Sequence, residues 1–167
     1  MLPKIKTILY CTSLGPHAPY IFGYACTLAK SLDAKIVAVH VIETLNRKQR
    51  TLLKSYAGQG RLHELLDQAH EQALAEFPKQ VQERLKPICS ESWDKLVSEV
   101  LVLQGDAEKR ILETIGTKNA DLVVVGAHTE SSLLDRVIGS TARSLAKKSP
   151  VPVLIVQVPE DVGNTSV

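Results

Sequence analysis

Leu122-Val123-Val124-Val125-Gly126 is the stretch of sequence that decides the fold. It is a continuous apolar run of strand length, rich in β-branched residues, and it ends at a glycine. Runs of this kind form strands buried on both faces, as in a parallel sheet between helices. Strand patterns also occur at Ile5–Thr12, Lys35–Ile42, Val97–Gln104 and Pro152–Val158.

Helical spacing of apolar residues occurs between these strand patterns. The helical segments are Pro19–Leu32, Arg61–Lys86, Asp106–Thr117 and Gly139–Lys148. Pro78 is expected to kink or split the longest of them. Alternating strands and helices make βαβ units, and therefore an α/β fold: an open, doubly wound, Rossmann-like parallel sheet with helices on both faces. Residues 1–159 are expected to form a single domain, followed by a flexible tail over 160–167.

Composition excludes several classes of protein. The chain has 167 residues, a formal net charge of +2 and 4% aromatic residues, too few for a surface on which nucleic-acid bases stack. Its pI of about 8.4 lies below the value above about 9 that is typical of nucleic-acid binders. No apolar run approaches the roughly 18 residues of a membrane span, and the N-terminus has no signal-peptide core.

The cysteines indicate a reducing compartment. Cys11, Cys26 and Cys89 are odd in number and far apart, so they fit neither a disulfide framework nor a CxxC metal site. We therefore expect a cytoplasmic protein that has neither a nucleic-acid partner nor a membrane partner.

The topology predicts where a ligand binds. Ligands of doubly wound sheets bind at the carboxyl ends of the strands, where the winding reverses. If the first and fourth strands are neighbours there, residues 11–15 and 126–129 assemble the site. Gly139-Ser140-Thr141 then opens a helix, whose free N–H groups and positive dipole end favour an anion such as phosphate. The same Gly-Ser start also suits a simple helix cap.

These segments resemble the universal stress protein family. The resemblance rests on Asp121–His128, Ile138–Ala142 and Pro150–Val156, with further matches at Gly105–Leu112, Ile8–Thr12 and Val39–Ile42. It covers about residues 4–158 and implies a five-stranded parallel sheet of order 3-2-1-4-5. It also implies a homodimeric regulator of stress tolerance that binds an adenine nucleotide, ATP or AMP.

The glycine pattern of the family's nucleotide-binding members is only partly present. Gly126, Gly139 and Ser140 fit it at the right spacing, whereas Thr129 replaces its second glycine. Thr129 resists positive φ, but its hydroxyl is able to donate a hydrogen bond. Ser13 stands where binding members usually have an Asp, which the resemblance would place near the ribose or the metal-bound phosphates. Losing that carboxylate weakens the case for Mg²⁺-bound ATP more than the case for AMP.

The resemblance assigns the expected ligand contacts. Phosphate and ribose would be held by Gly126, His128, Gly139, Ser140 and Thr141, with Thr129 as a further contact, and the adenosine side would be lined by Thr12, Ser13 and Val41. Two alternatives stay open. One is a family member that has lost nucleotide binding and acts through its dimer surface or another small ligand. The other is a weak nucleotide hydrolase, at most a slow ATPase, because no nucleophile–base pair or metal-ligand set is visible.

Four further features carry expectations. His40 lies in an apolar strand and is expected to be a core histidine with satisfied hydrogen bonds, and Cys11 a small buried hydrophobe. The basic run from Arg47 to Lys54 is expected to be a solvated loop, with a lid over an anion as the alternative. Strand Val151–Val158 is apolar on both faces, which predicts an edge strand that pairs with its copy in a homodimer.

Overall fold

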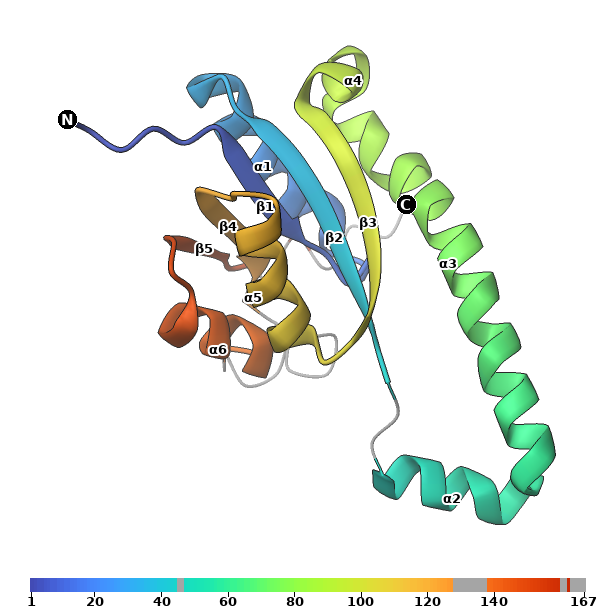
Figure 1. Ribbon diagram of the computed structural model, residues 1–167. Helices are drawn as coiled ribbons and strands as arrows, with labels where there is room; N and C mark the ends of the chain where they lie inside the picture. Colours follow the sequence, from blue (N-terminus) through green and yellow to red (C-terminus); the bar gives the residue numbers. More distant parts are fainter. Residues whose placement is uncertain (45–46, 128–137, 160–161, 163–167) are drawn as a thin grey trace.

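The strands form one parallel sheet, as the alternation predicts. The computed structural model describes residues 1–44, 47–127, 138–159 and 162, and its strand order is β3-β2-β1-β4-β5 (Figure 1). The strands are β1 (Thr7–Cys11), β2 (Lys35–Glu43), β3 (Val97–Gly105), β4 (Leu122–Gly126) and β5 (Val153–Val156). The predicted topology is therefore confirmed, although β1 and β5 are shorter than the sequence pattern indicated. β5 lies at an edge of the sheet, as expected.

Most helices begin and end close to their predicted bounds. They are α1 (Ala18–Leu32), α3 (Gln59–Cys89), α5 (Ala107–Thr117) and α6 (Ser140–Lys148). The helix α3 continues through Pro78, so of the expected kink or split, the split is wrong. Proline removes only one backbone hydrogen bond, and Phe77 and Val81 on either side of it pack against the core. A 3-10 turn, η1 (Ser90–Ser92), and the short α4 (Trp93–Leu96) lead from α3 into β3.

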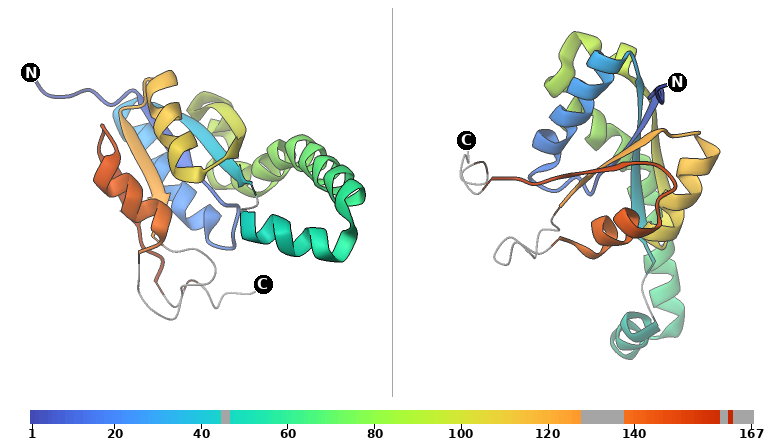
Figure 2. Two further views of the ribbon diagram at one scale, coloured as in Figure 1. Left: turned by 60° about the horizontal axis from the view of Figure 1, so that its bottom comes forward. Right: turned by 90° about the vertical axis from the view of Figure 1, so that its left-hand side faces the viewer.

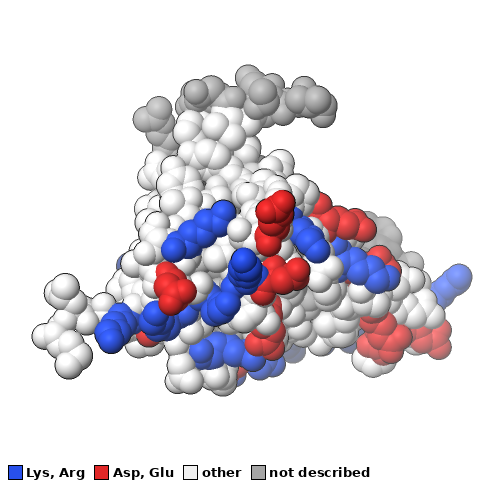
Figure 3. Space-filling view, turned by 90° about the horizontal axis from the view of Figure 1, so that it is seen from above, with Lys and Arg blue, Asp and Glu red and all other residues white. Residues whose placement is uncertain are grey.

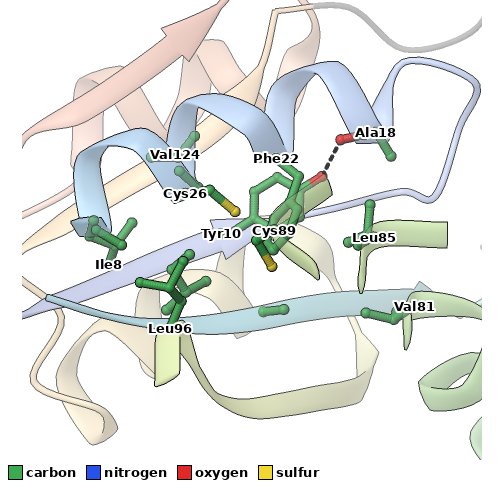
Figure 4. Packing of buried hydrophobic residues seen from close by; sticks show 14 of the residues in the cluster. Ile8, Tyr10, Ala18, Phe22, Cys26, Val81, Leu85, Cys89, Leu96 and Val124 are labelled. Carbon is green, nitrogen blue, oxygen red and sulfur yellow. Dashed lines mark hydrogen bonds between the residues drawn. The ribbon is translucent and has the colours of Figure 1, made fainter. Parts of the chain in front are cut away.

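Two hydrophobic clusters lie on opposite faces of the sheet. Helix α1 and the C-terminal part of α3 cover one face, and α5 and α6 cover the other (Figure 2). Successive strand residues alternate between the faces, so Tyr10 joins the first cluster and Leu9 the second. In the first cluster, the ring centroids of Tyr10 and Phe22 are 5.1 Å apart (Figure 4). Those of Phe22 and Trp93 are 5.8 Å apart.

The segment expected to be a basic loop is a helix, which corrects that prediction. Helix α2 (Arg47–Ala57) and the N-terminal part of α3 form a helical arm that extends beyond the carboxyl end of β2 (Figure 1). Arg, Lys, Gln and Leu are all good helix formers, so the segment is helical while its side chains stay in solvent, as expected for a charge run. The apolar side chains of α2 are not part of the core: Leu52 is 63% exposed and Tyr56 is 84% exposed.

Surface charges are mixed where the strands begin. Figure 3 shows Lys and Arg interspersed with Asp and Glu on this end of the molecule. One such pair is Lys6 and Asp33, with Nζ 3.4 Å from the carboxylate oxygen.

Within the part of the chain that the structure describes, no helix combines the length and the apolar character needed to span a bilayer.

Candidate functional site

A cavity of about 510 Å³ opens at the carboxyl ends of β1, β2 and β4. These three strands are neighbours, with β1 in the middle, and the chain winds in opposite directions on either side of it. The wall comes from the loop after β1, the end of β2 and the start of α6, which are far apart in the sequence. The pairing of β1 with β4 that the site prediction assumed is present.

The structure brings most of the predicted contact residues together. Thr12, Ser13, Val41, Gly126, Gly139, Ser140 and Thr141 all line the cavity. His128 and Thr129 were also predicted to be contacts, but they lie outside the described residues. Ligand contact by any of these side chains stays a prediction.

The start of α6 supplies hydrogen-bond donors to one side of the cavity. Gly139 is the N-cap, without a side-chain cap, and its N–H donates to the carbonyl oxygen of Ala127 at 2.7 Å. Arg143 N–H makes the first intrahelical bond, to Gly139 at 3.0 Å. The amides of Ser140 and Thr141 precede that bond, so they have no acceptor within the helix. Both residues line the cavity, where these amides and the helix dipole favour an anionic group.

Hydrogen bonds fix the loop after β1. Leu14 has a left-handed backbone, with φ of 55°, and its N–H donates to Thr12 Oγ1 at 3.0 Å. Arg84 of α3 donates to the carbonyl oxygens of both Leu14 and Gly15. The loop wall of the cavity is therefore held by its own side chains and by the long helix.

His40 belongs to the cavity wall and not to the core, which corrects the prediction. Its Nδ1 lies 2.7 Å from the carbonyl oxygen of Thr12, so one of the expected hydrogen bonds is present. The imidazole stacks on the ring of Phe77 from α3, with centroids 3.8 Å apart and planes 11° apart. Burial lowers the pKa of His40, and this effect is larger than the opposing effect of the bond to Thr12.

His17 is a wall residue that the sequence did not single out. It lies at the N-cap of α1 and lines the cavity. Its Nε2 is buried and has no hydrogen-bond partner in the described part of the structure. No motif marks a histidine at a helix start, and only the tertiary structure reveals the unpaired nitrogen.

Burial disfavours the reactive thiolate form of Cys11, the thiol in the wall. Cys11 ends β1 and lines the cavity, half-buried. Burial raises the pKa of its thiol to about 12, so it stays protonated at neutral pH. A thiol without its thiolate form is a poor nucleophile, and this group packs as a small apolar side chain.

The described part of the wall offers few ligands for a magnesium ion. Among the described residues, no three His, Cys, Asp or Glu side chains are grouped to bind a metal. The described wall has one carboxylate, Glu43, which lies at the end of β2, across β1 from α6. Ser13 stands at the end of β1, and its Oγ accepts a hydrogen bond from the N–H of Gly15 at 3.4 Å. Mg²⁺ beside a phosphate is usually held by at least one carboxylate, and the described residues place none beside Ser13 and the start of α6.

A sequence model of the universal stress protein family matches residues 4–157. The chain belongs to the universal stress protein family. Universal stress protein MJ0577 of Methanocaldococcus jannaschii is 25% identical over 155 residues, which cover 91% of this chain and 94% of that protein. Universal stress protein MJ0531 of the same organism is 27% identical over 137 residues, covering 82% and 73%. The resemblance drawn from the sequence is thereby confirmed.

Solved structures of universal stress proteins share this fold. UspA from Lactobacillus plantarum has a TM-score of 0.67 at 19% identity, over 93% of this chain and 99% of its own. The structure of MJ0577 has a TM-score of 0.64 at 20% identity, over 95% and 99%. A universal stress protein solved in complex with cAMP has a TM-score of 0.55 at 19% identity, over 92% and 98%.

Proposed function

We propose that this universal stress protein binds an adenine nucleotide in the cavity at the ends of β1, β2 and β4, as a stress-related regulator. One observation carries the proposal: the free amides at the start of α6 share a single cavity wall with the loop after β1 and the end of β2. Family membership and the shared fold with a universal stress protein in complex with cAMP support it.

The polar groups of the cavity favour a ligand with one anionic end. Hydrogen-bond donors of α6 lie beside β4, whereas His40 and Glu43 lie on β2. Two strand spacings of about 4.8 Å separate β4 from β2, roughly 10 Å in total. A nucleoside monophosphate laid across β1 spans that distance, with its phosphate at α6 and its nucleoside at β2.

The wall favours AMP over Mg²⁺-bound ATP. No Lys or Arg lines the described part of the cavity, and within that part the amides of α6 are the main counterpart for negative charge. One phosphate suits that arrangement better than three. Ser13 replaces the family's carboxylate, which removes a ligand for a phosphate-bound metal ion.

Two measurements test the proposal. Mass spectrometry of ligand released from gently purified, denatured protein is expected to detect AMP or a related nucleotide. Calorimetric titration is expected to give tighter binding of AMP than of ATP with Mg²⁺. In Gly139→Val the added branched side chain crowds the free amides, and we expect the Kd for AMP to rise at least about tenfold. Gly116→Val, at a position in α5 with open space around it, is the matched control. No released nucleotide and no binding heat would refute the proposal.

The same measurements distinguish a second candidate function. Ser13 at the end of β1 also suits a family member that no longer binds nucleotides and holds another small ligand. A different compound in the released fraction, with no heat from any adenine nucleotide, would support that alternative. Phosphate release from ATP that survives Gly139→Val would place any slow hydrolysis outside this cavity.

We also propose a homodimer through the edge strand β5. Pairing residues 151–158 with the same strand of a second copy would satisfy the backbone groups at this edge, because within the described part of the chain β5 pairs with β4 alone. Sedimentation at micromolar concentration is expected to give the mass of a dimer. Ile155→Lys is expected to shift that mass toward the monomer, whereas Leu52→Lys on the helical arm is not. A monomeric wild-type protein would contradict this proposal.

A further inference from the structure

We propose that His40 determines the specificity of the cavity: its Nε2 accepts a hydrogen bond from a donor group of the bound nucleoside, either an amino group of the base or a hydroxyl of the ribose. This inference rests on the proposed nucleotide binding and adds the side chain that distinguishes one nucleoside from another.

The contact with Thr12 fixes which nitrogen carries the proton. The carbonyl oxygen of Thr12 lies 2.7 Å from Nδ1 and has no hydrogen of its own, so Nδ1 must be the donor. Burial lowers the pKa of His40, and the ring is therefore neutral at pH 7. In a neutral imidazole with a protonated Nδ1, the other nitrogen presents only a lone pair.

The contact with Phe77 fixes the plane of the ring. The two rings are nearly parallel, with centroids 3.8 Å apart, and Phe77 itself packs against the first hydrophobic cluster. The imidazole is thus held at one edge by Thr12 and on one face by Phe77. A group held in this way loses little conformational freedom when a ligand binds, so its hydrogen bond is effective.

Among the described residues, the Nε2 atom of His40 has no hydrogen-bond partner. The residue lines the cavity. In the described part of the chain, the unpaired nitrogen atoms that are fully buried are His17 Nε2 and His70 Nδ1. His40 Nε2 is not one of them, so this unpaired atom is accessible. The lone pair of Nε2 is therefore free to meet a group that enters the cavity.

A fixed acceptor selects for donors and against other acceptors. Adenine has an amino group where hypoxanthine and guanine have a carbonyl oxygen, and the ribose hydroxyls are also able to donate. One neutral hydrogen bond of this kind corresponds to a change of roughly 2- to 12-fold in Kd.

Calorimetric titration with matched ligands tests the inference on the full chain. The ligands are AMP, purine riboside 5′-monophosphate, which lacks the amino group, 2′-deoxy-AMP and 3′-deoxy-AMP. In the wild-type protein, one analogue is expected to bind roughly 2- to 12-fold more weakly than AMP, and its identity names the donor. In His40→Phe, which keeps an aromatic ring on Phe77, that difference is expected to vanish. His63→Phe, an exposed position on α3, is the control and keeps it.

Nitrogen NMR of the wild-type protein gives a readout that does not depend on the variant folding. At pH 7 we expect the Nε2 resonance of His40 to be that of an unprotonated nitrogen, and to shift upfield with AMP but not with inorganic phosphate. A protonated Nε2, an unchanged resonance with AMP, or equal weakening of all four ligands by His40→Phe would overturn the inference. Failure of the wild-type protein to bind any nucleotide would instead refute the proposed function itself, and the inference with it.

Discussion

The guanidinium group of Arg84 in α3 donates a hydrogen bond to the backbone carbonyl oxygen of Leu14, in the loop that forms one wall of the cavity. A second nitrogen of the same group donates to Gly15 at 3.1 Å. Leu14 has a φ of 55°, a backbone conformation that is unfavourable for residues other than glycine. One side chain of the long helix therefore stabilises an unfavourable stretch of the binding loop.

Arg84→Ala is expected to lower the free energy of unfolding by about 1–3 kcal/mol, because two carbonyl oxygens lose a charged donor. The unfolding free energy of Arg84→Lys is expected to lie between those of the wild-type protein and Arg84→Ala, since an ammonium group does not reproduce the two parallel hydrogen bonds of a guanidinium group. Urea denaturation measures both changes. Arg61→Ala, an exposed position in the same helix, is the control, and an equal effect there would argue against a special role for Arg84.

Gly126 and Ile21 are expected to be energetically coupled. A Cβ atom on Gly126 would lie 2.6 Å from Ile21 Cδ1, the flexible end of that side chain. Because only the end of a flexible side chain has to shift, Gly126→Ala is expected to destabilise the fold by no more than about 1 kcal/mol, and Ile21→Val alone by about 0.5–1.5 kcal/mol. The double variant is expected to lose less than the sum, because valine lacks the Cδ1 atom. Strictly additive free energies of unfolding would contradict this contact.

Tyr10→Phe is expected to cost about 0.5–1.5 kcal/mol of stability. The hydroxyl of Tyr10 donates to the carbonyl oxygen of Ala18 at 3.0 Å inside the first cluster (Figure 4). Burial raises the pKa of Tyr10, so the hydroxyl stays protonated and remains a donor. Tyr56→Phe, on the exposed face of α2, is the control and should leave the denaturation midpoint unchanged. Equal midpoints for Tyr10→Phe and the wild-type protein would show that this bond adds no stability.

His40 is expected to make the fold less stable in mild acid. Its pKa in the folded protein lies below the value of about 6.5 that it has in an unfolded chain. Between these two values the unfolded state binds more protons, so stability is lost as the pH falls through this window and is complete above it. The unfolding free energy of the wild-type protein minus that of His40→Phe is therefore expected to become smaller from pH 7 to pH 5, because only the wild-type protein has this titrating group. A difference that stays constant with pH would contradict the lowered pKa.

The sequence predicts those parts of the molecule that follow from local pattern and chain order. The run Leu122–Gly126 and its alternation with helices predict a doubly wound parallel sheet, and the family resemblance implies its strand order. The family's spacing of Gly126 and Gly139 locates the start of α6 in the cavity wall. The charge run of α2 correctly indicates exposure to solvent, but exposure is shared by loops and surface helices, and the helix follows from the intrinsic propensity of its residues.

The histidines could not be assigned from the sequence. The role of His40 depends on Thr12, which is 28 positions away, and on Phe77 in a helix whose approach to β2 no periodicity specifies. A histidine in an apolar strand fits a core position as well as a position in a cavity wall. His17 is similar, because its unpaired nitrogen is a property of the assembled wall and has no counterpart in the local sequence.

The cavity wall joins residues near Thr12, His40 and Ser140, and so depends on nearly the whole chain being folded. Neither half of the protein contains the site alone, and the unfolded chain does not contain it at all. Any ligand that occupies the cavity is therefore linked to global unfolding, and it raises the unfolding free energy by about 2.7 kcal/mol at a free concentration of one hundred times Kd. A thermal shift on adding ligand then measures affinity directly. In a cell, the same linkage makes the lifetime of the protein depend on the concentration of its ligand.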